Sequence, residues 1–392
     1  MAVRGQRRRL RKQYDNPAHF MLTTFDKYLL KRLVHTFLVF FIATYGLYMV
    51  IDLFTNIDDF MQEGYSRADV VKAIGRFYGF RVAEFLEMAG PTLIVLSAIA
   101  VLGLLEKHSE SHPILAAGIP AFRILQPMLL GGTLLSVILI VNQEVIMPGL
   151  AVELQTPRGS TNASVQKVEP VYDYFNYLMH IDGEEVVIED RKLVRASFNL
   201  PRELATQSYA IESESAVYMA KTDRHPAGWL LQNLTGLFDA NMLTEEGRAR
   251  VIPRSNGRDV FIISDVSFDQ LYNRGRNLKL LSSMQLIERI RNPSTGYVPV
   301  QSQSLALHSR ITRPLLTLFS IAIALPLVMR RESQSLIMNM AVCALVLGVF
   351  YGFFQGCLAL SSSHFLRPDL AAWLPVIVMA GASVWTSGYV QT

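Results

Sequence analysis

Two histidines and a glutamate lie close together in one short polar stretch of this chain. His108, Glu110 and His112 fall within residues 104–123, which read LLEKHSESHPILAAGIPAFR. Histidines four residues apart can face one metal ion from the same side of a helix. Pro113 follows directly, and a proline disfavours helical geometry in the residue before it, so we expect ordinary loop histidines here. The sequence therefore predicts no metal, catalytic or cofactor site in this stretch.

The sequence also lacks the motifs of several enzyme classes. ATP hydrolysis by a P-loop requires a Gly-Lys pair, because backbone amides, a lysine and a hydroxyl together hold the nucleotide phosphates. No Gly-Lys dipeptide occurs in the 392 residues, and neither a G-x-S-x-G nor an H-E-x-x-H pattern is present. ATP hydrolysis is therefore not expected of this chain.

Charged residues near the ends of apolar stretches are the next candidates for binding chemistry. Arg310 and Arg313 begin the fourth apolar stretch, where their side chains either extend to a membrane surface or hold the phosphates of an anionic lipid. Asp52 ends the first stretch, and we interpret it as a residue at the membrane interface rather than on a substrate path. The two arginines are the candidate lipid-phosphate contacts.

Three glycines form a ridge in the fifth apolar stretch. Gly348, Gly352 and Gly356 repeat every four residues, a spacing that lets neighbouring helices approach closely. The ridge predicts either packing inside this chain's own bundle or a face that meets a second membrane subunit.

The elements that must position these residues are membrane spans. The chain is 51% hydrophobic and only 18% charged. A helix that crosses a bilayer needs about 20 mostly apolar residues, and soluble helices of that length would need charge on their outer face. Six stretches meet the requirement, namely residues 33–53, 85–105, 124–147, 311–329, 336–360 and 371–390.

Basic residues predict which side of the membrane the chain ends face. Residues 1–32 form a tail rich in arginine and lysine that we expect to lie in the cytoplasm near anionic lipid. Six spans then place both termini inside, with residues 33–147 holding the first three spans and 306–392 the last three. Nucleic acid is not an expected partner, because the tail has no interleaved aromatic residues and no folded scaffold.

Residues 148–305 have the composition of a separate water-soluble domain. Short β-rich segments alternate with turn residues such as Asp182-Gly183 and Asn256-Gly257. This pattern predicts an all-β sandwich or jelly roll, inserted between spans three and four on the outer side. The expected strands are 174–181, 185–188, 193–198, 216–220, 229–233 and 260–268, and the segment 282–291 is expected to be helical.

The segment 106–123 connects spans two and three on the cytoplasmic side. Ser109 or Ser111 can cap a short helix there, and Gly118 followed by Pro120 can end it. Such a helix fits a groove on a partner, although the residues alone leave a plain connector equally open. Its apolar side would carry Ile114, Leu115 and Ile119.

The order of these elements, together with several short motifs, resembles the LptF/LptG (YjgP/YjgQ) family of permease subunits of the lipopolysaccharide-transport ABC exporter. That family's cytoplasmic pattern is approximately S-E-L-x-A-L-R-A-A-G-I, and Ser109-Glu110 and Ala116-Ala117-Gly118-Ile119 match it at the same spacing. The residues 142–148 (NQEVIMP) are similar to the family's exit from span three. The fourth span of this chain resembles that of the family at His308, Arg310, Pro314, Pro326-Leu327 and Arg330-Arg331.

Three positions depart from the family pattern. Leu115 replaces a common arginine and Pro113 a helix former, so the contact with a partner is expected to differ in detail. Asp52 stands where some members carry a basic residue near the outer end of span one.

The resemblance implies a transport permease in the bacterial inner membrane, built as a heterodimer with a second LptF/LptG-type subunit. A cytoplasmic LptB-like ATPase dimer would drive it, and a periplasmic LptC-like bridge would receive lipopolysaccharide, or a similar large glycolipid, from the β domain. Spans one and five form lateral gates in this family, which implies a gate or subunit interface at Gly348, Gly352 and Gly356. Coupling to the ATPase is implied for Glu110, Ile114, Leu115, Ala116, Ala117, Gly118 and Ile119.

Two other classes of function remain open at this point. A membrane-anchored binding or scaffold protein with a β domain would need no coupling segment. A secondary transporter would be expected to carry ionisable residues or broken helices at mid-depth in the membrane. The exporter is the interpretation that uses the coupling segment, the spans and the inserted domain together.

Overall fold

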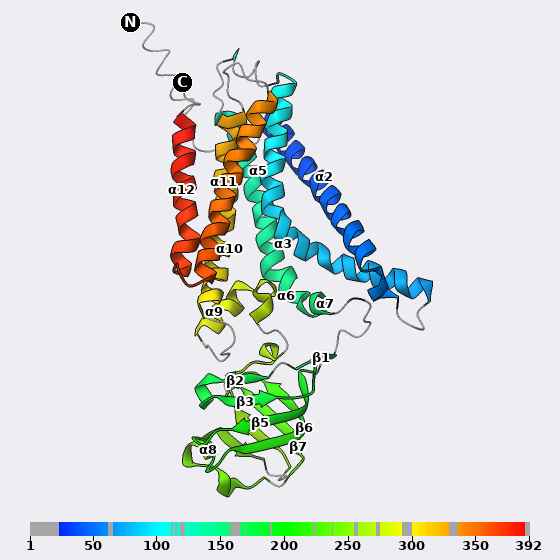
Figure 1. Cartoon of the computed structure of the whole chain (residues 1–392), viewed down its shortest axis with the longest axis vertical. Coiled ribbons are helices and arrows are strands. Elements are labelled where there is room, and N and C mark those ends of the chain that lie inside the picture. The colour runs from blue at the N-terminus through cyan, green and yellow to red at the C-terminus, as the bar shows by residue number, and fades with distance from the viewer. Residues whose placement is uncertain are drawn as a thin grey trace.

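The computed structural model describes fifteen stretches of the chain. Within them, six helices are long and apolar enough to cross a membrane, and they form one bundle with a β domain beyond one end (Figure 1). The predicted fold class is therefore confirmed. Residues 1–22 of the predicted tail 1–32 lie outside the described residues, as do Arg330-Arg331. The described residues are 23–61, 66–110, 113, 116–117, 122–156, 158, 165–168, 170–188, 190–222, 225–236, 238–254, 258–271, 275–291, 300–328 and 336–388.

The first three spans are longer than their apolar cores. They are α2 (Thr24–Thr55), α3 (Arg67–Lys107) and α5 (Phe122–Val141), and α5 continues through the π-helical turn η2 (Asn142–Ile146) into α6 (Met147–Gly149) and α7 (Ala151–Gln155). Residues 67–84, predicted as a connection, are instead the first part of α3. Ser66 and Asp69 form a capping box there, which starts the helix well before its apolar core.

The last three spans are α10 (Val300–Val328), α11 (Leu336–Ser362) and α12 (Pro368–Gly388). α10 begins inside the range 148–305 that the sequence assigns to the β domain. The short helix α9 (Ser283–Arg291) precedes it and agrees with the predicted helical segment. α2 begins and α12 ends at the end of the bundle opposite the β domain (Figure 1).

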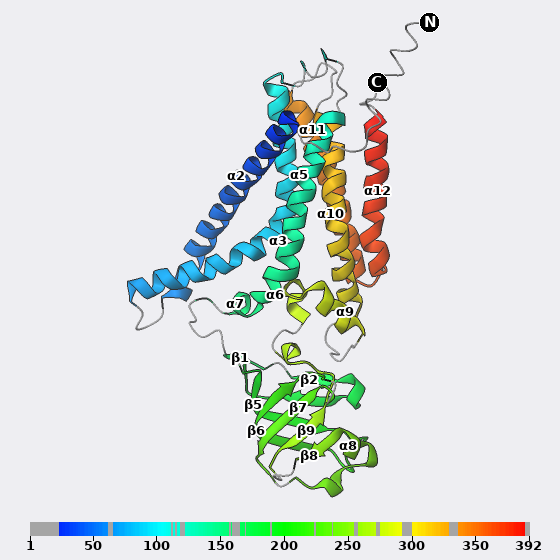
Figure 2. The same ribbon diagram turned by 180° about the vertical axis from the view of Figure 1, so that it is seen from behind.

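α3 is bent, and α2 diverges from the other spans on the side to which the first part of α3 turns. Pro91 lies inside α3, where a proline removes the hydrogen bond to the carbonyl four residues before it and kinks the helix. The first part of α3 consequently turns away from the other spans and meets the far end of α2 (Figures 1 and 2). The buried residues of α2 all lie in its first half: Asp26, Leu29, Leu33 and Phe37.

The β domain is built on a nine-stranded antiparallel sheet with the order β1-β4-β5-β6-β7-β9-β8, and β2 and β3 pair beside β5. β5 pairs with β4 through one half and with β3 through the other, and Arg195 between them has φ 47°, a left-handed conformation that bends the strand. The strands are β1 (Val165–Lys167), β2 (Val171–Asp173), β3 (Met179–Asp182), β4 (Glu185–Val187), β5 (Lys192–Leu200), β6 (Tyr209–Met219), β7 (Gly228–Leu234), β8 (Val251–Pro253) and β9 (Val260–Ile263).

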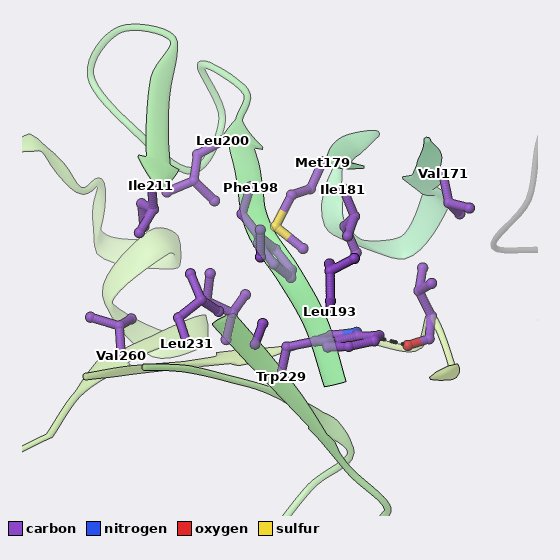
Figure 3. Packing of buried hydrophobic residues seen from close by; sticks show 14 of the residues in the cluster. Val171, Met179, Ile181, Leu193, Phe198, Leu200, Ile211, Trp229, Leu231 and Val260 are labelled. Carbon is purple, nitrogen blue, oxygen red and sulfur yellow. Dashed lines mark hydrogen bonds between the residues drawn. The ribbon is translucent and has the colours of Figure 1, made fainter. Parts of the chain in front are cut away.

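One tryptophan organises the core of the β domain. Trp229 on β7 is fully buried, and its Nε1 donates a hydrogen bond to the carbonyl oxygen of Val266 at 3.0 Å (Figure 3). Phe198 and Leu193 of β5 pack over it. The predicted strand 174–181 is wrong in its first half, because residues 174–176 form a 3-10 turn capped by the side chain of Asp173.

Candidate functional site

The end of α3 opposite the β domain is closed by an unusual cap. Ser109 has φ 56°, so it occupies the left-handed position that glycine usually takes after a helix. The Glu110 amide donates to the carbonyl of Leu105 at 2.9 Å, and the Ser109 amide donates to that of Glu106 at 3.0 Å. Ser109 therefore ends α3 rather than starting the predicted short helix, and the cap fixes where Glu110 leaves α3.

The Glu110 carboxylate contacts the first turns of α2. Arg32 Nη1 lies 3.3 Å from Glu110 Oε2, and the Tyr28 hydroxyl donates to the same oxygen at 3.1 Å. Arg32 Nη1 also donates to the Tyr28 hydroxyl at 2.7 Å, which closes a three-residue cluster. These partners could not be predicted from the sequence, because 82 positions separate Tyr28 from Glu110.

A second ion pair joins the other end of segment 106–123 to α2. Arg123 Nη2 lies 2.8 Å from Asp26 Oδ2, and Asp26 is 5% exposed. Asp26 also forms a capping box with Thr23, which begins α2. Arg123 Nη1 donates to Gln126 Oε1 at 2.6 Å, so the guanidinium is held from both sides.

Between these two ion pairs, part of the predicted coupling set is described. Ala116 and Ala117 are exposed, and the Ala117 amide donates to the carbonyl of Pro113 at 3.0 Å, as in one helical turn. Their role in coupling stays a prediction. The remaining members, Ile114, Leu115, Gly118 and Ile119, lie outside the described residues, as does His112.

A cavity of about 320 Å³ opens between α3, α10 and α11. Its walls are mostly apolar, with Val95, Leu316 and Phe354 among them. Its charged part is one ion pair, in which Arg313 Nη1 lies 2.8 Å from Glu87 Oε1. The Arg313 side chain is 37% exposed and that of Glu87 10%, so the arginine is the more accessible partner.

Arg310 has a different position from Arg313. Its side chain is 9% exposed, and its Nη2 donates to the carbonyl of Leu278 at 2.7 Å. Glu144 Oε1 lies 3.7 Å from Nη1, and the Glu144 carboxylate also receives the Ser283 amide at the start of α9. Arg310 thus joins α10 to the helices next to the β domain, whereas Arg313 lines the cavity. The role of either arginine as a lipid-phosphate contact stays a prediction.

Residues 142–144 of the motif 142–148 also connect the spans to the elements next to the β domain. Asn142 Nδ2 donates to the carbonyl of Ala83 on α3 at 3.0 Å, and Gln143 Nε2 donates to that of Lys279 at 2.8 Å. Together with Glu144, these side chains tie α3, α5 and α9 to one another where the β domain begins.

The glycine ridge of α11 is open. A Cβ placed at Gly348, Gly352 or Gly356 would have no atom of the described chain within 4 Å. Packing inside this chain's own bundle is therefore excluded for these glycines, and Gly348 lines the cavity. Their predicted role as a gate or subunit interface stays a prediction.

Asp52 lies in a polar cluster at the β-domain end of α2. The Tyr78 hydroxyl donates to Asp52 Oδ2 at 2.8 Å, and Arg158 Nη2 lies 2.9 Å from Asp52 Oδ1. Asp52 thus connects α2 both to α3 and to the segment that enters the β domain. Sequence reasoning missed these partners, and it also passed over Glu87, although a charged residue inside a predicted span is itself a functional signal.

Six helices that can cross a membrane, in two groups of three with a β domain between the groups, define a multi-pass membrane protein. The chain belongs to the family of lipopolysaccharide export system permeases LptF/LptG, whose family model matches residues 27–389. A search of curated proteins found no match. The predicted family membership is confirmed.

Proposed function

We propose that this chain is one of two permease subunits that extract lipopolysaccharide, or a similar large glycolipid, from the bacterial inner membrane. A separate cytoplasmic ABC ATPase dimer would supply the energy through residues 106–123. The β domain would pass the lipid to a periplasmic bridge protein. The observation that carries this proposal is the family match, because it includes the β domain and nearly all of the six spans.

The cavity beside α11 supports a lipid with acidic groups as the cargo. The apolar walls of the cavity suit acyl chains. Arg313 can hold a lipid phosphate in a bidentate pair if the phosphate replaces the carboxylate of Glu87 as its partner. Glu87 keeps the guanidinium paired until then, so no isolated buried charge is left in the membrane.

The size of the cavity supports a second permease subunit. About 320 Å³ is at the lower limit of small-ligand sites, which range over roughly 300–1,000 Å³. A glycolipid with several acyl chains therefore needs walls beyond this chain. Gly348 of the open ridge lines the cavity, and Gly348, Gly352 and Gly356 together would let a partner helix approach closely.

A charge-removal series at Arg313 tests this function. The chain is purified with its partner permease, the ATPase and the bridge protein, and placed in proteoliposomes that contain lipopolysaccharide. Wild type is expected to transfer lipid to the bridge only with ATP. Arg313→Gln is expected to reduce transfer by about 10-fold or more, the loss typical of a charged hydrogen bond at 1.5–3 kcal/mol.

Two controls separate phosphate binding from stability. Arg367→Gln changes an exposed arginine in the connection between α11 and α12 and is expected to transfer lipid normally. The double variant with Glu87→Gln and Arg313→Gln removes both charges of the ion pair, so neither side chain is left as an unpaired buried charge. Transfer should stay low in this double variant. Recovery would mean that Arg313 serves only to neutralise Glu87, and a wild-type complex without ATP-dependent transfer would refute the exporter itself.

The intramembrane ion pair is also what a secondary transporter would carry. A transporter of that class would move its substrate along an ion gradient in the absence of the ATPase. The same proteoliposomes without ATPase, under an imposed proton or sodium gradient, distinguish the two functions, and we expect no transfer there.

A further inference from the structure

We propose that α2 is driven directly by the residues on either side of the connection between α3 and α5, through two ion pairs that hold Glu110 and Arg123 against the first three turns of α2. The pairs are Glu110 with Arg32, supported by Tyr28, and Arg123 with Asp26. The proposal rests on the proposed function, because the ATPase supplies the movement. Arg32, Tyr28, Asp26 and Arg123 are positioning residues in it.

The first pair is built to keep its geometry. Glu110 follows the left-handed cap at Ser109, so its backbone position is fixed by two hydrogen bonds to the last turn of α3. Its carboxylate meets both Arg32 and Tyr28, and the Arg32 guanidinium also lies 5.6 Å from the centre of the Tyr28 ring. Three groups that satisfy one another hold a position better than one exposed ion pair does.

The second pair is coupled to the start of α2 itself. Asp26 Oδ2 receives the Thr23 amide at 2.9 Å and the Thr23 hydroxyl at 2.8 Å while it contacts Arg123. Movement of Arg123 away from Asp26 would leave a carboxylate that is 5% exposed without its cation. The helix start and α5 are therefore expected to move together.

α2 can act as a lever, by which we mean a long helix that is held near one end and moves as a rigid unit. Its 32 residues span about 48 Å at 1.5 Å per residue. Leu29 and Leu33 are buried near the ion pairs, and a Cβ at Gly131 of α5 would lie 2.5 Å from the Leu33 side chain, so α5 supports the helix closely at this point. Beyond Phe37 the helix has little cover, with Ile42 68% and Phe54 77% exposed.

The far end of α2 contacts the segment that leads into the β domain. Asp52 contacts Arg158, which lies in the segment between α7 and β1. A tilt of α2 that begins at segment 106–123 would therefore arrive both at the side of the bundle and at the entry to the β domain. α3 is a poorer transmitter, because the bend near Pro91 separates its two halves (Figures 1 and 2).

A charge exchange tests the first pair in the assembled complex. Glu110→Arg and Arg32→Glu are each expected to lower the lipid transferred per ATP hydrolysed by about fivefold or more, the low end of coupling between two sites. The double exchange restores the pair with reversed charges and should recover most of that ratio. Glu184→Arg with Arg195→Glu reverses an exposed 2.8 Å pair in the β domain and should change nothing.

The outcomes separate this inference from the proposed function. If the double exchange stays as impaired as the single variants, Glu110 acts on another chain and the lever is refuted. If Glu110→Gln couples like wild type, the pair is not used and the lever is also refuted. Failure of the wild-type complex to transfer lipid would instead refute the exporter.

A distance measurement covers the case in which the exchanged variants do not assemble. Spin labels at Val39 of α2 and Ala117 are expected to keep their separation between nucleotide-free and ATP-bound complexes, whereas labels at Val39 and Ile377 of α12 should change theirs. All three positions are exposed, and the native Cys343 and Cys357 are buried. A changed Val39–Ala117 distance with a constant Val39–Ile377 distance would overturn the proposal.

Discussion

At the scale of residues, the position of Glu110 depends on the backbone of Ser109. A serine at φ 56° adopts a conformation that costs an L-residue about 1–2 kcal/mol relative to glycine. The two capping hydrogen bonds to the end of α3 hold it there. In this chain Ser109 therefore ends α3, and Glu110 contacts α2.

Substitution at Ser109 should test this account of the cap. Ser109→Val places a β-branched residue in the left-handed conformation and is expected to speed amide exchange at residues 109 and 110 by about 5–30-fold, equivalent to 1–2 kcal/mol. Ser109→Gly should leave exchange as slow as in wild type or slower. Hydrogen–deuterium exchange of the purified chain measures both.

The matched control is His108→Val, because His108 is exposed and has φ −89°, which a β-branched residue adopts freely. Equal acceleration in the His108 and Ser109 variants would show that bulk, and not the backbone conformation, controls the cap.

At the scale of elements, the bend of α3 decides where α2 can go. A straight α3 would carry its first turns along the bundle and away from the far end of α2. The bend instead brings Tyr78 to Asp52 and lets the aromatic rings of Tyr45 and Phe85 meet at 5.2 Å between the two helices. Pro91 is the residue that the sequence offers as its cause.

Replacement of Pro91 should straighten α3. Pro91→Ala restores a hydrogen bond to the carbonyl of Glu87, so the first part of α3 is expected to move away from α2. Spin labels at Val50 and Val71, both exposed, should report a longer distance between the two helices. Pro326→Ala in α10 is the matched control and should leave this distance unchanged. An unchanged distance in the Pro91 variant would mean that packing alone imposes the bend.

At the scale of the whole molecule, the polar parts of the chain separate to the two ends of the bundle. The end of α3, the starts of α2 and α5 and the end of α12 lie at one end, and the β domain lies beyond the other (Figure 1). The end away from the β domain is predicted to face the cytoplasm from the basic residues of the sequence.

Cysteine labelling tests that orientation. In sealed membrane vesicles with the periplasmic side outward, a membrane-impermeant maleimide should label Arg202→Cys in the β domain. It should label Ala117→Cys only after permeabilisation. Both positions are exposed, whereas Cys343 and Cys357 are buried, so the wild-type chain is the unlabelled control. Labelling of Ala117→Cys in sealed vesicles would reverse the orientation.

The sequence by itself determined the six spans, the inserted β domain and the family. Spans and strands are set by the local content of apolar, charged and turn residues, and the family by motifs in a fixed order. Only the tertiary structure decided the partners, because they lie far apart in the chain: 226 positions separate Glu87 from Arg313, and 97 separate Asp26 from Arg123. It distinguished Arg310 from Arg313, which look alike in sequence, since burial and the nearest carboxylate depend on how helices pack. It likewise showed the glycine ridge to be open, and it attached segment 106–123 to α2.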